Sequence, residues 1–309
     1  MRRPRSRARL LSHYADFLEC LRGRPDLAGA YHRRTVALDP EDPEIRGRYA
    51  VYLETACGDY DGAEAEYLAG LASAPNHPDL LGNYADFLEH ARADMDAAER
   101  YYRRALEVDP AHPNNLTNYA TFLTEVRGQH DRAESLYQLA LTVAPLHRNA
   151  LFKYALFLTD VKRAYADAVK LYRVAHSLYP ENAAIMANLA GALFLAGRTG
   201  EARTALRHAL SHPALRRPSA DAAECWFYQV VYGDPDERLP ALAHLRQLLD
   251  AGVRSPGFRL EPHVAAAWAE GHPWRAWLGP LAAVLTGEAE ADELAGWAEW
   301  AKARPGDVH

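Results

Sequence analysis

The sequence, 309 residues long, predicts an all-α protein folded as a solenoid of helical hairpins. The main observation is a five-residue motif of the form Tyr-Ala-x-aromatic-Leu that returns at a fixed period. The motif or a close variant begins at Tyr14, Tyr49, Tyr84, Tyr119, Tyr154 and Leu189, so neighbouring copies are 35 residues apart. Such a period indicates stacked supersecondary units, each of which buries its apolar face against a neighbour. The helical spacing of apolar residues and the placement of proline and glycine then define each unit.

The first expected element of each unit is an α-helix that contains the motif. In the third unit an apolar face is formed at helical spacing by Tyr84, Ala85, Phe87 and Leu88. This spacing does not fit an alternating strand. A polar residue followed by proline, as in His77-Pro78, suits the start of this helix. Because His77, His112 and His147 recur once per unit at this place, we expect caps and not ligands that converge on one metal ion.

A second helix completes each unit. In the third unit its apolar positions are Ala98, Tyr101, Tyr102, Ala105 and Leu106. Pro110 ends this helix, because proline lacks the amide hydrogen and clashes with the preceding turn. Between the two helices, Gly58 and Gly128 in the second and fourth units stop the first helix and permit a tight reversal. Each unit is therefore predicted to be an antiparallel helical hairpin.

These residues resemble the tetratricopeptide repeat family, whose units carry small residues where helices touch, aromatic and leucine fillers, and a closing proline. The matching positions of the third unit are Ala85, Leu88, Ala98, Tyr102, Ala105 and Pro110, and the fourth and fifth units repeat them in register. The resemblance covers roughly residues 8–213. It implies a right-handed solenoid of about six repeats with a helical capping region after it.

The repeat departs from the usual family period of about 34 residues. In the first five units the small residue of the first helix and that of the second are 13 positions apart, as in Ala85 and Ala98. In the sixth unit Ala190 and Ala202 are 12 positions apart. We therefore expect one extra residue near the turn of the first five hairpins.

The remaining residues, 214–309, form a second predicted segment that caps the solenoid formed by residues 1–213. All six tryptophans of the sequence lie in this segment. The expected helices are 220–231, 235–250, 262–270, 273–285 and 291–302, separated by glycine- and proline-containing breaks. An open solenoid end must be covered, which favours a cap. Since tryptophan is also common at binding hot spots, a tryptophan-rich partner-binding pocket is the alternative.

Composition excludes several classes of protein. No apolar run approaches the roughly 20 residues that span a bilayer, and no signal-peptide core follows the N-terminal arginines, so we expect a cytoplasmic protein without membrane contact. The net charge of −6 argues against nucleic-acid binding. Cys20, Cys57 and Cys225 lack pairing motifs and are expected to be free thiols. The N-terminal arginines, Arg2, Arg3, Arg5, Arg7 and Arg9, form either a solvated tail or a segment that docks on an acidic surface.

No catalytic, cofactor or metal site is predicted. His208 and His212 are four residues apart, but Pro213 ends their helix and the sequence shows no third ligand for zinc. The segment 252–257 places its first glycine three residues before Ser255, which does not match a nucleophile elbow. No glycine-rich phosphate loop is present. We therefore predict a protein that is not an enzyme and needs no cofactor.

The resemblance implies that the first helices line a concave peptide-binding face. Directly before each motif stand, among others, Arg48, Asn83, Asn118, Lys153 and Asn188. An asparagine at this place resembles the ladder by which some family members, including O-linked N-acetylglucosamine transferases, hold a peptide backbone. Its amide donates and accepts at once, so it pairs with any peptide group. The alternative is that asparagine there only tolerates exposure.

Around this column the predicted face changes from acidic to apolar along the chain. Asp86 and Glu89 are acidic, Thr121 is neutral and polar, and Phe152 and Leu156 are apolar. A matching partner is a protein or extended peptide with a basic segment at one end. The prediction is thus a non-catalytic binding scaffold. The alternatives are a peptide-responsive regulatory sensor that acts through a partner protein and an enzyme with its site in the C-terminal segment.

Overall fold

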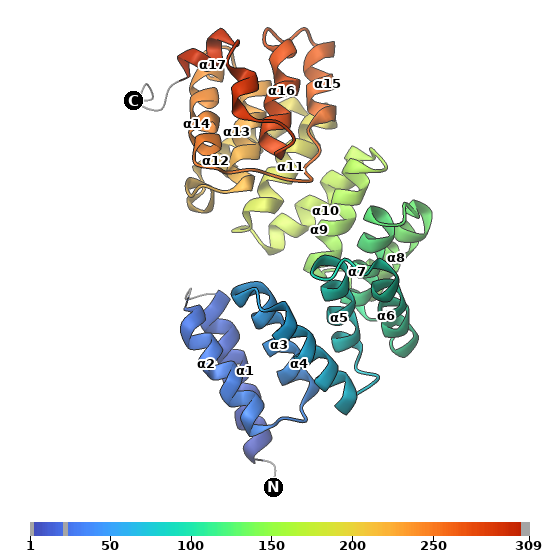
Figure 1. Ribbon diagram of the computed structural model, residues 1–309. Coiled ribbons are helices and arrows are strands. Elements are labelled where there is room, and N and C mark those ends of the chain that lie inside the picture. Colours follow the sequence, from blue (N-terminus) through green and yellow to red (C-terminus); the bar gives the residue numbers. More distant parts are fainter. Residues whose placement is uncertain (1–2, 21–23, 304–309) are drawn as a thin grey trace. The chain divides into compact units, whose positions relative to one another are not determined.

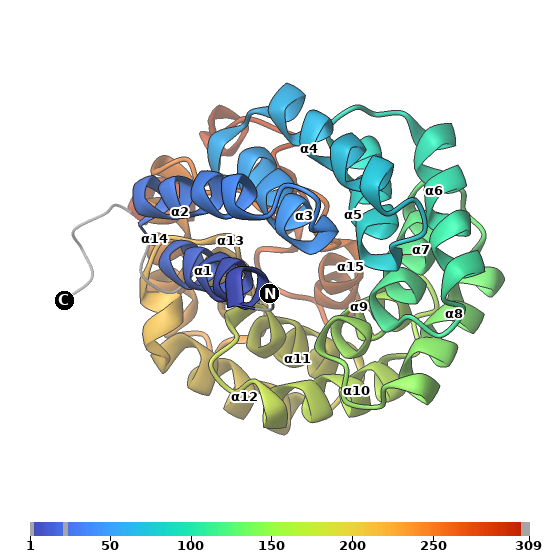
Figure 2. The same cartoon turned by 90° about the horizontal axis from the view of Figure 1, so that it is seen from below.

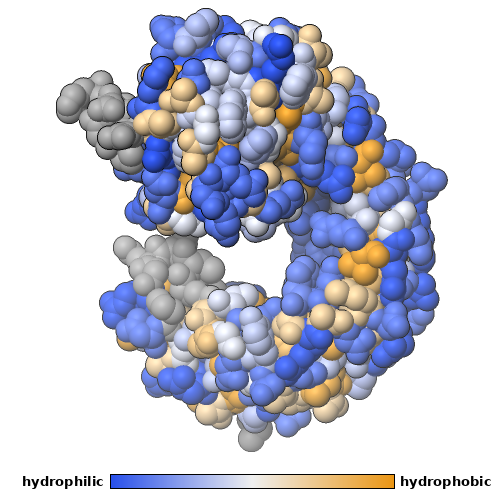
Figure 3. Space-filling model, turned by 45° about the horizontal axis from the view of Figure 1, so that its top comes forward, coloured by the Kyte–Doolittle hydropathy of each residue, from blue (hydrophilic) through white to orange (hydrophobic). Residues whose placement is uncertain are grey.

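The structure is a computed structural model that describes residues 3–20 and 24–303. Every regular element in these ranges is a helix, which confirms the predicted all-α fold class. No helix within them has both the length and the apolar character needed to cross a bilayer. The chain divides into two compact units, Met1–Ala150 and Leu151–His309, which are described separately (Figure 1). The face in Figure 3 is largely hydrophilic, with apolar residues in small groups.

The helices pair into the expected hairpins. The first unit contains α1 (Arg3–Cys20), α2 (Pro25–Leu38), α3 (Pro43–Tyr52), the short π-helix η1 (Leu53–Cys57), α4 (Tyr60–Ser73), α5 (Pro78–His90), α6 (Met95–Val108), α7 (Pro113–Glu125) and α8 (His130–Val143). The unit boundary falls within α9 (Arg148–Asp160). The second unit continues with α10 (Tyr165–Leu178), α11 (Ala183–Leu195), α12 (Thr199–Ser211), the 3-10 helix η2 (Pro213–Arg216), α13 (Ala220–Tyr232), α14 (Arg238–Asp250), α15 (Glu261–Ala269), α16 (Arg275–Thr286), the 3-10 helix η3 (Ala291–Leu294) and α17 (Ala298–Lys302).

Within the first unit the helices form two layers, with α1, α3, α5 and α7 in one and α2, α4, α6 and α8 in the other (Figure 2). Neighbouring first helices contact one another, α1 with α3, α3 with α5 and α5 with α7. Among the described residues no contact of comparable extent joins neighbouring second helices. The stack of this unit therefore curves toward its first helices, which line its inner face.

Small residues and tyrosines fill the interior of each hairpin. Ala85, Ala98 and Tyr102 have no exposed surface, and their equivalents 35 residues later are also buried. The predicted caps are confirmed, because Nδ1 of His77 accepts a hydrogen bond from the amide of Leu80 at 3.4 Å and His112 and His147 do the same in the next two units. Local sequence thus determines both where the helices start and which face they bury.

A repeated polar contact joins neighbouring hairpins of the first unit. Glu64 accepts hydrogen bonds from the Tyr84 hydroxyl at 3.1 Å and from Arg92 at 2.9 Å. Thirty-five residues later, Glu99 accepts from Tyr119 at 3.2 Å and Arg127 at 2.9 Å. Because these groups are partly exposed, each contact adds little stability by itself. The third hairpin therefore docks on the second in the same way as the fourth docks on the third.

The extra residue of the first five hairpins lies in the turn, as predicted. In each of them the carbonyl of the motif leucine accepts a hydrogen bond from the amide six residues later, for example Asp94 N to Leu88 O at 2.9 Å. In the sixth hairpin the amide of Arg198, five residues after Leu193, makes this bond at 3.0 Å. The sixth turn thus has the hydrogen-bond span of a Schellman motif, and the other five are one residue wider.

In the second unit, α13 packs directly on the sixth hairpin. The ring of Phe194 on α11 stacks on that of Tyr232 with centroids 3.9 Å apart, and Phe194 is only 6% exposed. Gly191 allows this approach, because a Cβ there would lie 2.4 Å from the Tyr228 hydroxyl. The apolar end of α11 is therefore covered by the chain itself.

The C-terminal helices lie near their predicted positions, with one correction. Residues 291–302 do not form one helix but η3 and α17, separated by Ala295, Gly296 and Trp297. Trp297 is 1% exposed and stacks on Trp277 with centroids 5.9 Å apart, so burial of its ring draws the chain out of helical geometry. The predicted division at residue 213 concerns the loss of repeat register and stays a prediction.

Two predictions fall partly outside the described residues. Arg2 and the side chains of Arg3, Arg5 and Cys20 lie outside them. Arg9 lies within them and pairs with Asp42, with Nε and Oδ2 2.9 Å apart. The described cysteines, exposed Cys57 and buried Cys225, are free thiols.

Candidate functional site

The inner face of the first unit carries most of the predicted binding residues. Asn83 is exposed on α5, and Asn118 is partly exposed at the equivalent place on α7. Oδ1 of Asn118 accepts a hydrogen bond from Nδ2 of Asn149 at 3.2 Å. Within the described residues the amide nitrogen of Asn118 makes no hydrogen bond of its own. Two side-chain amides therefore lie one repeat apart, and in Asn118 only the oxygen is hydrogen-bonded.

Four carboxylates form what we call the acidic patch: Glu54 on η1, Asp86 and Glu89 on α5, and Glu125 at the end of α7. The Tyr67 hydroxyl donates to Glu54 Oε2 at 3.2 Å, and the Tyr102 hydroxyl donates to Glu89 Oε2 at 2.9 Å. Glu89 is 7% exposed, whereas the side chain of Asp86 is 47% exposed. The patch thus has a buried part and a solvent-exposed part, and the exposed Asp86 carboxylate lies 3.6 Å from Nδ1 of His90.

The electrostatics of the acidic patch favour a positive ligand. Burial raises the pKa of Glu54 and of Glu89, and the nearby Asp86 carboxylate raises both further, although the tyrosine hydrogen bonds oppose these effects. Burial lowers the pKa of His90, but the backbone carbonyl of Asp86 and the surrounding carboxylates outweigh it, so this pKa is raised. A positive group that docks here relieves repulsion among the carboxylates.

Within the described residues one group brings three potential metal ligands together. Asp86, Glu89 and His90 place one ligand atom each within 4.8 Å of one another. Both carboxylates were predicted from the sequence but His90 was not, although the spacing i, i+3, i+4 on one helix indicates that the three side chains share a face. Since Glu89 is held by Tyr102 and exposed acidic groups commonly occur without an ion, we interpret the group as part of the acidic patch.

Arg48 and Thr121 also lie on the inner helices of the first unit, with partners inside the chain. Arg48 pairs with Glu44 at 3.0 Å, one turn earlier on α3. The Thr121 hydroxyl donates to the carbonyl of Thr117 at 3.1 Å and lies 3.0 Å from the Tyr137 hydroxyl. Both side chains are partly exposed.

In the second unit the predicted residues have two different environments. Phe152, Lys153 and Leu156 are partly exposed on α9, and the ring of Phe152 meets that of Tyr172 edge-on at 6.1 Å. Asn188 on α11 is buried, with its Nδ2 donating to Ala184 O at 2.9 Å and its Oδ1 accepting from the Tyr172 hydroxyl at 3.4 Å. The amide of Asn188 is therefore used within the chain.

The second unit also contains a buried polar pair that the sequence analysis missed. Ser255 donates its hydroxyl hydrogen to Glu224 Oε1, and both residues are at most 5% exposed. Burial raises the pKa of Glu224 to about 8, with the nearby Asp221 and Asp160 carboxylates adding to the effect. Ser255 belongs to the segment compared above with a nucleophile elbow. Its hydroxyl hydrogen-bonds a carboxyl group that is held protonated inside the fold, which is a structural arrangement.

His208 and His212 gain a neighbour that the sequence did not indicate. The ring of His176 on α10 lies 6.0 Å from that of His208, and the ring of His208 lies 6.4 Å from that of His212. Burial lowers the pKa of His176, and the two neighbouring imidazoles lower it further. Nε2 of His212 meets Glu181 at 2.8 Å. Within the described residues these imidazoles are not among the groups whose ligand atoms converge within 4.8 Å.

Comparison with known proteins identifies the repeat. Family models described as tetratricopeptide repeat match residues 79–112 and 162–220. The two matches cover the third unit, the second helix of the fifth and the whole of the sixth. A search of curated proteins found no match.

Solved structures of other proteins share the fold. PilF from Pseudomonas aeruginosa is 18% identical, with a TM-score of 0.50 over 78% of this chain and 99% of its own. A tetratricopeptide repeat protein from Parabacteroides merdae is 14% identical, with a TM-score of 0.51 over 90% and 98% of the two chains. The protein TTC0263 from Thermus thermophilus is 18% identical, with a TM-score of 0.53 over 60% and 99%.

Proposed function

This chain belongs to the tetratricopeptide repeat family, and from that premise we propose that it is a non-catalytic scaffold that binds a protein or an extended peptide. Proteins of this family generally mediate protein–protein interactions. The observation that carries the proposal is the presence of an exposed amide, Asn83, and a partly exposed one, Asn118, on the inner helices of the first unit that also carry Asp86 and Glu89 of the acidic patch. The proposed binding residues of this unit are Arg48, Asn83, Asp86, Glu89, Asn118 and Thr121.

The chemistry of these residues defines the partner. Asn83 and Asn118 pair with peptide groups of an extended backbone, which gives affinity without selecting side chains. Asp86, as the open part of the acidic patch, selects a lysine or arginine in the partner. The fixed carboxylate of Glu89 adds to the field at that point. The partner is therefore a polypeptide with a basic segment, and its binding needs no cofactor.

The second unit contributes a different kind of surface to the proposal. Phe152 and Leu156 receive apolar side chains, and Lys153 offers one positive charge beside them. Asn188, which completes the predicted set, has its amide engaged within the chain, so its proposed part is to shape α11 and not to pair with a peptide. We place the protein in the cytoplasm, on the basis of its three cysteines without pairing motifs.

Site-specific cross-linking tests the location of the site. A photoreactive residue is placed at Asn83 or, as a control, at Leu139, which is 41% exposed on the second helix α8. After irradiation in the native cell, cross-linked partners are identified by mass spectrometry. We expect partners at position 83 and not at position 139. Cross-links confined to position 139 would show that the inner face is not the binding surface.

Substitutions then separate backbone from charge recognition for a partner found in this way. Asn118→Ala should weaken every bound sequence by about 1 kcal/mol, the usual net value of such a hydrogen bond. Asp86→Lys should weaken basic sequences selectively and reduce the salt dependence of their binding. Glu107→Lys makes the same charge change on an exposed residue of the second helix α6 and should have little effect. Equal effects of the two lysine variants would contradict the role of the acidic patch.

A further inference from the structure

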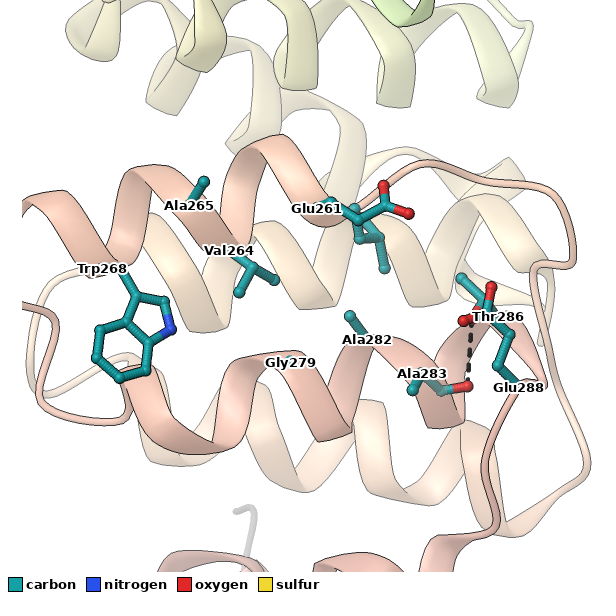
Figure 4. Close-up of a pocket in the computed structure, with 10 residues that line it drawn as sticks. Glu261, Val264, Ala265, Trp268, Gly279, Ala282, Ala283, Thr286 and Glu288 are labelled. Atoms are coloured by element: carbon teal, nitrogen blue, oxygen red, sulfur yellow. Dashed lines mark hydrogen bonds between the residues drawn. The ribbon is translucent and has the colours of Figure 1, made fainter.

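A groove between α15 and α16 lies outside the proposed binding face. It has a volume of about 510 Å³ and runs along the two helices, which are joined by residues 270–274 (Figure 4). Val264 and Trp268 of α15 line one side, and Gly279, Ala282 and Ala283 of α16 line the other. Trp268 is 54% exposed and is the most exposed tryptophan of the chain. An apolar groove with a half-exposed indole is a common feature of binding surfaces.

The α16 side, which forms the floor of the groove, is open because its side chains are small. A Cβ built on Gly279 meets no atom within 4 Å, although this glycine lies in the interior of a helix. Ala282 and Ala283 continue the floor on the same helix (Figure 4). Small residues let another helix approach closely. The floor thus leaves room for the close approach of a helix.

The two ends of the groove carry opposite charges. At one end Glu261, the first residue of α15, lies near Glu288, just beyond α16 (Figure 4). Neither carboxylate forms an ion pair or hydrogen bond with any residue that the structure describes. At the other end the Arg275 guanidinium lies 5.5 Å from the centroid of the Trp268 ring. A ligand that matches the groove is therefore apolar along its length and basic at the end near the two glutamates.

We infer that this groove binds an amphipathic α-helix of a protein partner, with a lysine or arginine of that helix placed between Glu261 and Glu288. An extended peptide fits poorly, because the groove lining offers helical backbone and apolar side chains and would leave the amides of the peptide without partners. A helix satisfies its own backbone and presents an apolar face. This site is separate from the proposed binding face of the first unit and takes a helical ligand.

The spacing within the groove sets the sequence pattern of the partner. Glu261 and Trp268 are seven residues apart on α15, which corresponds to about 10 Å along the helix axis. The partner helix therefore carries its basic residue and the apolar residue that covers Trp268 about two turns apart, at i and i+7, with apolar residues between them at i+3 and i+4. No such pattern is required for binding to the inner face of the first unit.

A selection experiment on the full chain tests the inference. The probe is a phage-displayed library of 16-residue helices, with apolar residues varied along one face and Lys, Arg, Gln or Glu allowed at the end position. The chain should enrich helices with the i, i+3, i+4, i+7 pattern and a basic end residue. Gly279→Leu fills the groove and should weaken these helices at least tenfold. Gly200→Leu is the matched control, because it adds the same side chain to open space on α12 and should leave binding unchanged.

Charge reversal gives the second readout. The double variant Glu261→Lys with Glu288→Lys should now select Glu at the end position, whereas Glu41→Lys with Glu107→Lys, at two exposed sites elsewhere, should still select Lys or Arg. Circular dichroism and the melting temperature show whether each variant is folded. The inference is overturned if no helix is enriched, if enriched helices tolerate Gly279→Leu, or if the reversed variant keeps the preference of the wild type. Concentration-dependent self-association abolished by Gly279→Leu would also overturn it, since the occupant would then be a second copy of the chain.

Discussion

Helices α5 and α7 of the first unit and helix α11 of the second occupy the same place in the repeat, yet their surfaces differ. The residue before the motif is exposed in α5 and partly exposed in α7, as Asn83 and Asn118. In α11 it is Asn188, which is buried and hydrogen-bonded within the chain. Register therefore fixes the direction of a side chain within its hairpin. Whether that side chain meets solvent is decided by what the chain packs on it next.

The central motif position shows the same contrast more strongly. It holds Asp86 in α5 and Thr121 in α7, both at least partly exposed. In α11 it holds Gly191, and the hydroxyl of Tyr228 from α13 fills the space where a side chain would be. The same position is thus at least partly exposed in α5 and α7 and is used for close helix packing in α11.

The largest expected effect comes from adding a side chain at this position. Gly191→Leu should destabilise the protein by about 3 kcal/mol, because Tyr228 is 1% exposed and has no free space to move into. Val51→Leu, at the same motif position on α3, is the control and should cost less than about 1 kcal/mol, because Val51 is 37% exposed. Urea unfolding followed by circular dichroism measures both. Equal losses would mean that α11 and α3 do not differ in this way.

Glu224 on α13, the helix that covers α11, predicts a pH dependence of stability. Glu224 on α13 has a pKa of about 8 in the folded protein, well above that of an unfolded glutamate, so unfolding releases a proton at pH values between the two. Stability therefore falls as pH rises through this window, by roughly 1.4 kcal/mol per pH unit for one proton. Glu224→Gln keeps the oxygen that accepts from Ser255 and removes the titration. It should stabilise the protein at pH 8 relative to the wild type, with the advantage shrinking toward pH 5.

Denaturant melts of wild type and Glu224→Gln across this pH range test that prediction. Glu107→Gln on the surface of α6 is the control and should follow the wild-type curve. A constant difference between Glu224→Gln and the wild type at every pH would show that folding does not raise the pKa of Glu224.

The sequence predicted the repeat, its helices and its caps because these depend on neighbours within one unit. Proline and histidine at a helix start, and alanine at a helix contact, act over a few residues. Contacts between elements distant in sequence were not predictable in the same way. The covering of Phe194 by Tyr232 and the pairing of Glu224 with Ser255 depend on how α13 and the following segment pack, and no period records that. The groove between α15 and α16 likewise depends on packing after the repeat has ended.

A smaller loss of stability is expected where the repeat is regular. Ala133, on the second helix α8, has no exposed surface, and its equivalents Ala98 and Ala168 are also fully buried. Ala133→Leu should destabilise by roughly 1–3 kcal/mol through overpacking. Ser135→Leu on the exposed side of the same helix is the control and should change stability little. A thermal melt of Ala133→Leu that matches the wild type would contradict the assigned register.

The smallest expected effect concerns the wide turns, where the repeat places different residues in one backbone conformation. The residue with positive φ is Gly58, Ala93, Gly128 and Arg163 in the second to fifth hairpins, with φ between 53° and 65°. A residue with a Cβ pays a conformational penalty there, which glycine avoids. Arg163→Gly and Ala93→Gly should therefore each stabilise by about 0.5–1 kcal/mol, after the greater flexibility of glycine in the unfolded chain is subtracted.

Gly128→Ala is the converse test, since a Cβ at Gly128 meets no atom within 4 Å and only the backbone conformation is affected. If Arg163→Gly destabilises while Gly128→Ala has no effect, the turns are not held in this conformation in solution, and the extra residue of the 35-residue repeat has another role.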